Sequence, residues 1–199
     1  GKMGYGRINM FTAINGLTSP SIMMTQKSVT DSSQDPCVAN DTLYIRCSFV
    51  NYLLPTTGSV TAVLTTTTPS FVSIADGNSS LGVMQTMGSA HNNNDPFIVV
   101  VNPALPVNSK AIFTITLSDG SYTKKEIFSI TVNVDYINIS INEIATSITS
   151  KSLIGFNDFS TQQEGLGFRY IPGDSQNLLF DGGLMVGVSG KVSDNCRNS

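Results

Sequence analysis

The feature that most constrains the fold of this chain is a two-residue alternation of apolar and polar side chains through its middle part. Successive side chains of a β-strand point to opposite faces, so this alternation predicts strands with one buried face rather than helices. The clearest apolar positions are Leu43, Ile45, Cys47 and Phe49 in the run TLYIRCSFV, and Val60, Ala62 and Leu64 in the run GSVTAVLTT.

Further strand-like runs follow at short intervals and end in a long hairpin. The runs FVSIA, SSLGVMQTM and PFIVVV are bounded by Gly, Pro, Asn or Asp, which favour turns. In residues 110–134 two alternating runs flank Asp119-Gly120, a dipeptide typical of tight hairpins. The predicted inward residues of this hairpin are Ala111, Phe113, Ile115 and Leu117, facing Phe128, Ile130, Val132 and Val134.

The succession of short strands in residues 42–135 predicts an immunoglobulin-like antiparallel β-sandwich. The chain has no Trp, which excludes the Cys, Trp and Cys core of antibody domains. Residues 18–41 are rich in Ser, Thr, Asp and Pro and are predicted to be a linker with one short strand around Ile22 to Met24. Residues 136–199 carry short β-like runs at high glycine density, which indicates the start of a second, smaller β-domain.

The first residues of the chain predict a short helix. Asn9 is a good N-cap, because its side-chain oxygen can accept from the free amides of the first turn. Ile8 and Ala13 can form a hydrophobic staple, and Gly16 supplies a stop. Such a helix has about two turns, too few to be stable alone in water, so it must pack on something. The predicted fold class is therefore mainly β, with a short N-terminal helix and a smaller C-terminal β segment beside the sandwich.

Composition restricts the partners and the compartment. Charged residues make up 13% of the chain, about half the usual share, and Ser, Thr, Asn and Gly supply the polarity instead, which suits an extracellular β-sandwich. The net charge is −3 and the eleven Lys and Arg residues are scattered, so no nucleic-acid partner is expected. No run of about 20 apolar residues occurs, so no membrane span is expected. We expect the chain to be a piece of a longer protein.

The three cysteines allow two interpretations. Cys37 and Cys47 could form a short-loop disulfide in an oxidising compartment, which leaves Cys196 over or paired elsewhere. Alternatively, Cys47 lies on the inward face of its strand and is a small buried hydrophobe. No CxxC occurs, so the usual pattern of a zinc or thioredoxin-type redox site is missing.

No catalytic constellation stands out. The single histidine, His91, has Asp95 four residues later, but no GxSxG turn supplies a nucleophile, and a solvated loop residue is the simpler interpretation. The run NNND at 92–95, with Asp31, Asp35 and Asp41, offers oxygen ligands for calcium, although without EF-hand spacing. Asn and Asp also serve turns, so no cofactor is expected, with calcium the one ion left open. Neither GLGFRY nor GYGRIN has the pattern of a phosphate-binding loop.

The opening run GYGRINMFTAI resembles the end of the subtilisin-like serine protease (subtilase) domain, where a turn of the form G-x-G-x-[IV]-[ND] leads into a last helix. The matching residues are Gly4, Gly6, Ile8, Asn9 and Ala13, and Met10 departs from the usual Ala. The resemblance implies that residues 1–17 are the remnant of the last helix of a peptidase domain, and that Ile8, Phe11 and Ile14 would dock on the sandwich once the helix is severed from that domain.

A second resemblance covers most of the remaining chain. The runs from TLYIRCSFVNYL to FTITLSDGSYTKKEIFSITV are similar to the adhesion-related sandwich domains that follow secreted bacterial proteases. The family's catalytic Asp, His and Ser motifs do not occur here. The resemblance thus implies a secreted or cell-surface serine endopeptidase as the parent, with this inactive region as its tail.

Two functional hypotheses follow. In the first, the chain is a non-catalytic C-terminal accessory region that stabilises or positions its own upstream peptidase domain or contacts a protein substrate or a surface. In the second, it is an independent adhesin or carbohydrate-binding module that recognises a cell-surface glycan.

Overall fold

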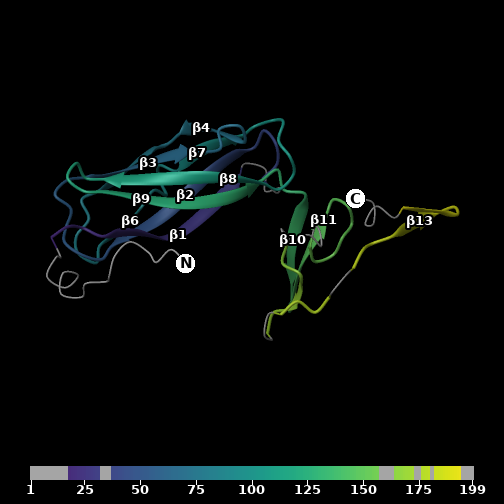
Figure 1. Ribbon diagram of the computed structural model, residues 1–199. Coiled ribbons are helices and arrows are strands. Elements are labelled where there is room, and N and C mark those ends of the chain that lie inside the picture. Colours follow the sequence, from purple (N-terminus) through teal and green to yellow (C-terminus); the bar gives the residue numbers. More distant parts are fainter. Residues whose placement is uncertain (1–17, 32–36, 157–163, 173–175, 180–181, 194–199) are drawn as a thin grey trace, which may run out of the picture. The chain divides into compact units, whose positions relative to one another are not determined.

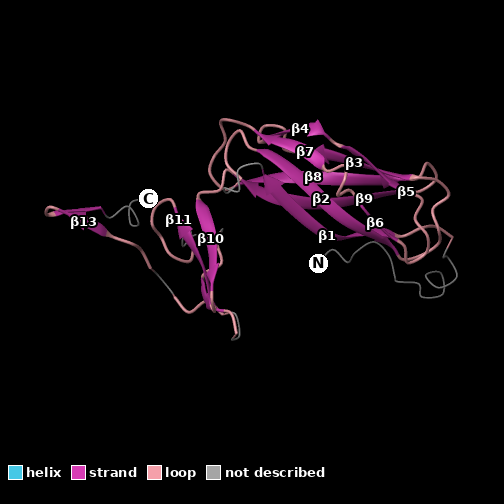
Figure 2. Cartoon of the chain, turned by 180° about the vertical axis from the view of Figure 1, so that it is seen from behind, coloured by secondary structure: helices cyan, strands magenta, loops and turns pink. Residues whose placement is uncertain are grey.

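The computed structural model is mainly β, with antiparallel sheets (Figures 1 and 2). No helix occurs in the part of the chain that it describes, and none there could cross a membrane. The helix predicted at residues 9–16 lies outside that part. The described residues are 18–31, 37–156, 164–172, 176–179 and 182–193.

The chain divides into two compact units whose boundary runs through two long strands. The described residues of the first unit are 18–31, 40–102 and 111–130. Those of the second unit are 37–39, 103–110 and the described residues from 131 onward. The first unit contains a two-layered β-sandwich and the second contains smaller sheets.

One layer of the sandwich is built on β2, whose burial alternates strictly along its length. Each inward side chain predicted from TLYIRCSFV is buried there. β2 pairs with β1, β6 and β7, so it lies at the centre of its sheet. The spatial order is β1 (Ile22–Asp31), β2 (Thr42–Asn51), β7 (Phe97–Val101) and β4 (Val72–Asp76), with β6 (Ser89–His91) also paired to β2.

The second layer contains the predicted hairpin. Its two long strands are joined by a turn in which Gly120 has a φ of 96°, a conformation that glycine adopts without strain. The carboxylate of Asp119 accepts the backbone amides of Thr57, Ser121 and Tyr122, and these bonds hold its pKa well below the usual range. The spatial order is β5 (Asn78–Gly82), β3 (Val60–Thr66), β8 (Ser109–Ser118) and β9 (Thr123–Val132).

The inward residues of both layers form one apolar core. The rings of Phe113 and Phe128 stack with centroids 5.4 Å apart. Strand β9 ends at Val132, so Val134, predicted as an inward residue, lies beyond it. The largest fully buried side chains are Phe49, Phe97, Phe113, Ile22, Leu43, Ile45, Met84, Ile115, Leu117, Val60, Val72 and Val99.

The prediction for the first strand was wrong in its length. The short strand expected around Ile22 to Met24 extends to Asp31 and pairs with β2 along its whole length. Ile22 is its one fully buried apolar residue, and a bulge between Met24 and Gln26 shifts the register. Alternation could not reveal β1 because an edge strand with mostly polar side chains carries little periodic signal.

The second unit has a small sheet in which polar residues are buried on one face and isoleucines are exposed on the other. On one face, Ser147 and Thr149 are buried, and Ser147 Oγ donates to Asn138 Oδ1 over 2.6 Å. On the other face, Ile137 lies opposite Ile148, and Ile141 lies opposite Ile144, and all four are exposed. The sheet order is β10 (Tyr136–Ile141), β11 (Ile144–Thr149) and β12 (Phe168–Tyr170), and a separate hairpin joins β13 (Val186–Val188) to β14 (Lys191–Ser193).

Candidate binding pocket beside strand β5

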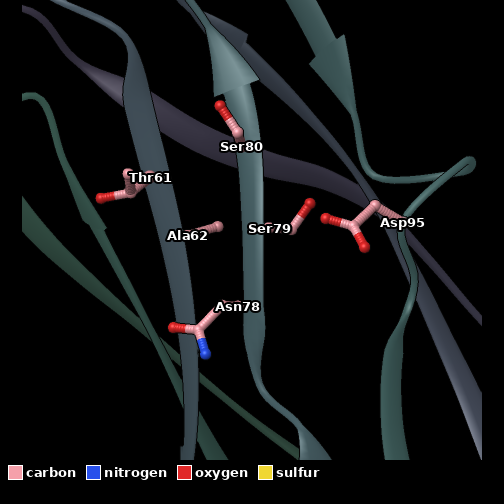
Figure 3. A pocket seen from close by; sticks show the side chains of 6 residues that line it. All are labelled: Thr61, Ala62, Asn78, Ser79, Ser80 and Asp95. Carbon is pink, nitrogen blue, oxygen red and sulfur yellow. The ribbon is translucent and has the colours of Figure 1, made fainter.

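An open pocket lies beside β5, the edge strand of the second layer, and polar residues contribute to its lining although most of its exposed surface is apolar (Figure 3). Its volume is about 230 Å³. A single water needs roughly 10–15 Å³, and pockets for small organic ligands begin near 300 Å³, so the space is much larger than one water requires and is at the small end for an organic ligand. The lining residues are Thr61 and Ala62 of β3, Asn78, Ser79 and Ser80 of β5, and Asp95 of the β6–β7 loop.

Ser79 is the buried polar group of this pocket. Its side chain is on the inward face of β5 and the residue is 5% exposed. Among the residues that the structure describes, its Oγ has no hydrogen-bond partner. A buried hydroxyl without a partner costs about 1–3 kcal/mol, so such a group marks a place where another molecule can supply the bond.

Asp95 faces Ser79 from the neighbouring loop. In Figure 3 its carboxylate and the Ser79 hydroxyl point toward one another, yet no direct hydrogen bond joins them. The loop is held by Asn92, whose Oδ1 accepts from Cys47 N over 2.6 Å and whose Nδ2 donates to Ile45 O over 3.2 Å. Asp95 N in turn donates to Asn92 O over 3.1 Å. The exposed carboxylate is thereby positioned by a buried anchor.

The start of β5 depends on Gly77, which joins β4 of one layer to β5 of the other. Leu64 N donates to Gly77 O over 2.7 Å, and a Cβ at Gly77 would come within 2.8 Å of Leu64 O. Only glycine allows this approach without displacing a backbone. Gly77 therefore sets where Asn78 and Ser79 enter the pocket.

The remaining polar groups are at the exposed rim. Thr61 Oγ1 donates to Ser118 O over 3.2 Å, and Ser80 Oγ lies 3.2 Å from Ser59 Oγ. The lining residues include one carboxylate and no cationic side chain. The pocket can therefore accept hydrogen bonds strongly through Asp95, and its hydroxyl and amide groups can both donate and accept.

No known family or curated relative identifies the chain. No family model matches it, and no curated protein matches its sequence.

Several residues considered in the sequence analysis do not form a catalytic site in the structure. His91 is exposed at the end of β6, and its Nδ1 accepts from Asn93 N over 3.4 Å. Asp95 lies instead in the pocket with Ser79. The resemblance residues Gly4, Gly6, Ile8, Asn9 and Ala13, together with Asp35 and Cys196, lie outside the described part of the chain.

The cysteines of the proposed disulfide are not joined in the structure. Cys47 is buried on the inward face of β2, as in the alternative interpretation. Burial raises the pKa of its thiol to about 11, and the nearby charge of Lys27 opposes part of that rise. Cys37 belongs to the second unit, where its carbonyl accepts from Val134 N over 3.2 Å.

The structure describes most of the residues considered as calcium ligands, with the exception of Asp35. Among the residues that the structure describes, no three His, Cys, Asp or Glu side chains lie close enough to hold a metal ion. Asn92, the first residue of the NNND run, uses both side-chain atoms on the backbone of β2. Of that run, Asp95 alone lines the pocket.

A second hollow lies in the second unit, at the start of β10. It has a volume of about 300 Å³ and is lined mainly by apolar and backbone atoms around Tyr136, Ile137 and Ile148. Burial, followed by the charges of Glu164 and Asp135, raises the pKa of Tyr136. Among the described residues that line this hollow, none has an unpartnered buried polar atom, so the hollow is a weaker candidate than the pocket beside β5.

Sequence reasoning missed Ser79, Asn78 and Thr61. The run SSLGVMQTM was predicted as one strand, but β5 ends at Gly82 and the next strand begins at Ser89. A serine on an inward face looks the same in sequence as a serine on an outward face. The one available signal was the polar run DGNSS between two strands, which interrupts the apolar alternation.

Proposed function

We propose that this chain is a non-catalytic β-sandwich binding module that acts as the C-terminal accessory region of a secreted subtilisin-like serine endopeptidase. The observation that carries the binding role is the pocket beside β5, where a carboxylate and a buried unpartnered hydroxyl face each other. The resemblance of residues 4–14 to the end of a subtilase domain supports the link to a peptidase. In this role the module contacts a protein substrate or a cell surface for its parent enzyme.

The strand order supports an immunoglobulin-like assignment. One sheet has the order β1-β2-β7-β4, and the other contains β3-β8-β9 in sequence across the sheet. Labelled by chain order, these correspond to strands A-B-E-D and C-F-G of an immunoglobulin-type sandwich, with β5 added beside C. Domains of this type commonly serve recognition through their loops and edges, which is where the pocket lies.

The link to a protease is tested with the longer protein from the same gene. We expect this longer protein to hydrolyse casein and to lose that activity when its nucleophile serine is changed to Ala. The chain studied here, assayed beside it, should be inactive. A longer protein without the three catalytic motifs and without hydrolysis would contradict the link.

An independent adhesin or carbohydrate-binding module is the second candidate. The pocket itself favours it, since Asp95 and the hydroxyl groups of Ser79, Ser80 and Thr61 are the groups that bind sugars in proteins. The two candidates differ in what precedes the module and agree that the module binds through this pocket. The upstream sequence and the casein assay therefore separate them.

A further inference from the structure

We propose that the pocket beside β5 binds one ring of a neutral saccharide, with Asp95 accepting from two adjacent ring hydroxyls and Ser79 Oγ contacting a third polar atom at the bottom. This inference rests on the proposed binding function and names the chemical class of its ligand. It uses the same six lining residues.

The buried hydroxyl of Ser79 requires a hydrogen-bond partner that a ligand can supply. Its Oγ is buried, has no partner in the protein, and faces Asp95 in Figure 3. Because this atom is buried, a ligand contacts it only when the Ser79 side chain turns toward the pocket, and the ligand must then bring a small polar atom into a space of about 230 Å³. A ring hydroxyl meets this requirement because it can both donate to and accept from a serine.

The second step is the charge of the pocket. Asp95 contributes a carboxylate, which is an acceptor only, and no lining side chain is cationic. Bringing an anionic ligand beside this carboxylate is unfavourable, so phosphorylated or carboxylated sugars are excluded. Two adjacent hydroxyls can donate to the two oxygens of one carboxylate, and charge-assisted bonds of this kind are the stronger ones.

The third step is the mixed character of the rim. Asn78, Ser80 and Thr61 are exposed and provide amide and hydroxyl groups. Such groups can bond a ligand that carries both donors and acceptors around its edge. A saccharide has both, whereas an ammonium group can only donate hydrogen bonds. The exposed rim also makes the pocket reachable by the terminal ring of a longer glycan.

The experiment is a titration of the ¹⁵N-labelled chain, followed by amide chemical shifts. The probes are the methyl glycosides of glucose, galactose and mannose. We expect saturable shifts at the amides of Ser79, Ser80 and Asp95, with a dissociation constant of about 1 mM or weaker for at least one glycoside. N-acetylneuraminic acid, which carries a carboxylate, should give none.

Two substitutions test the assigned contacts. Asp95→Asn should weaken glycoside binding about tenfold or more, because a hydrogen bond to a charged acceptor is lost. Ser79→Ala should also weaken binding while leaving the urea midpoint unchanged or higher, because the removed hydroxyl has no partner in the protein. The matched controls are Glu143→Gln, which removes an exposed carboxylate outside the pocket lining, and Ser73→Ala, which removes an exposed hydroxyl of β4. Both should bind as the unchanged chain does.

Several results would overturn the inference. The first is no saturable shift with any glycoside at about 100 mM. The second is binding that Asp95→Asn leaves unchanged. The third is saturable shifts of these amides with methylammonium chloride or calcium chloride but with no glycoside, which would assign the pocket to a cation. If the glycosides fail while the longer protein hydrolyses casein, this inference fails and the link to a protease stands.

Discussion

Two buried asparagines bond backbone groups in and beside β2 at places where the regular strand pairing stops. Asn51 Oδ1 accepts from Ser21 N over 2.9 Å, and its Nδ2 donates to Leu54 O over 2.7 Å. Asn92 bonds Cys47 N and Ile45 O in the gap between β6 and β7. Buried backbone groups must be paired, so these side chains take the place of strand residues.

Substitution of Asn92 tests this role. Asn92→Ala leaves one buried N–H and one buried C=O of β2 without partners, and we expect the free energy of unfolding to fall by about 2–4 kcal/mol. The measurement is urea denaturation followed by circular dichroism. Asn93→Ala, at the exposed neighbouring position, is the matched control and should change stability by less than about 0.5 kcal/mol. Equal stability of the two variants would contradict the role of Asn92.

Cys47 should be chemically inert in the folded chain. Burial raises its pKa from 9.0 to about 11, so at pH 9 it remains a thiol when folded and is half ionised when unfolded. The resulting contribution to the free energy of unfolding is fully present below pH 9. It is lost as the pH rises toward 11, because ionisation then favours the unfolded chain. We expect iodoacetamide at pH 8.5 to modify Cys47 far more slowly in the native chain than in urea, as measured by mass spectrometry of its peptide. Equal rates would show that the thiol is accessible and ionised.

At the scale of elements, Lys27 bridges the open side between β1 and β9, and Ile22 N donates to the Tyr122 hydroxyl just before β9 over 3.1 Å. Lys27 lies opposite Cys47 in the register of β1 and β2, so it points inward. Its Nζ donates to Ser129 O over 3.0 Å and lies 4.7 Å from the centre of the Phe128 ring. Both β1 and β9 are edge strands, and an inward charge on an edge discourages pairing with another chain.

Lys27→Met retains the aliphatic cover and removes the charge. We expect a loss of about 1 kcal/mol in the free energy of unfolding, from the hydrogen bond and the cation–π contact. We also expect concentration-dependent self-association, because Ser129 O becomes available to another strand. Analytical ultracentrifugation measures this association. Lys125→Met, at an exposed position of β9, serves as the control. If both variants associate to the same extent, the added apolar surface and not the unprotected strand edge causes the association.

Alternation predicted the central strands and also the inward residues Ile130 and Val132 of the edge strand β9, but it missed the length of the edge strand β1. Leu43, Ile45 and Phe49 of β2 are buried as predicted, because a strand with neighbours on both sides carries its burial pattern in its sequence. The length of β1 could not be predicted because its inward face carries the charged Lys27 as well as the apolar Ile22, so apolar and polar residues do not alternate along it.

The candidate site was only partly visible in the sequence. Asp95 was considered there as a calcium ligand or as a partner of His91. The structure brings it to Ser79, sixteen positions earlier in the chain, across two layers of strands. A pattern of apolar and polar residues cannot predict that Asp95 and Ser79 lie close together. Their proximity depends on the point at which the chain passes between the two layers at Gly77 and on the hydrogen bonds by which Asn92 holds the loop.

At the scale of the whole molecule, the two units differ in how much apolar surface they bury. The first unit encloses a continuous core that includes Phe49, Phe97 and Phe113. In the second unit, isoleucines such as Ile141 and Ile144 are exposed, and its buried positions include Ser147. Less apolar burial means less stability, so the units should open independently.

Hydrogen exchange should separate the two units. We expect amides of β2 and β8 to exchange at least about a hundredfold more slowly than those of β10 and β11, a difference of about 2.7 kcal/mol in opening free energy. Mass spectrometry of peptides from the native chain, normalised to the same peptides in urea, gives the comparison. Similar protection throughout would show that the chain opens as one cooperative unit.

The anchoring of the β6–β7 loop also bears on how such a module can evolve. Asn92 fastens the loop to β2, whereas Asn93, Asn94 and Asp95 are exposed beyond it. Mutations at these three exposed positions leave the hydrogen bonds of Asn92 intact, so selection for stable folding does not remove them. If the pocket binds a ligand as proposed, gene duplicates can diverge in the ligand they bind through a few point mutations while they keep one scaffold.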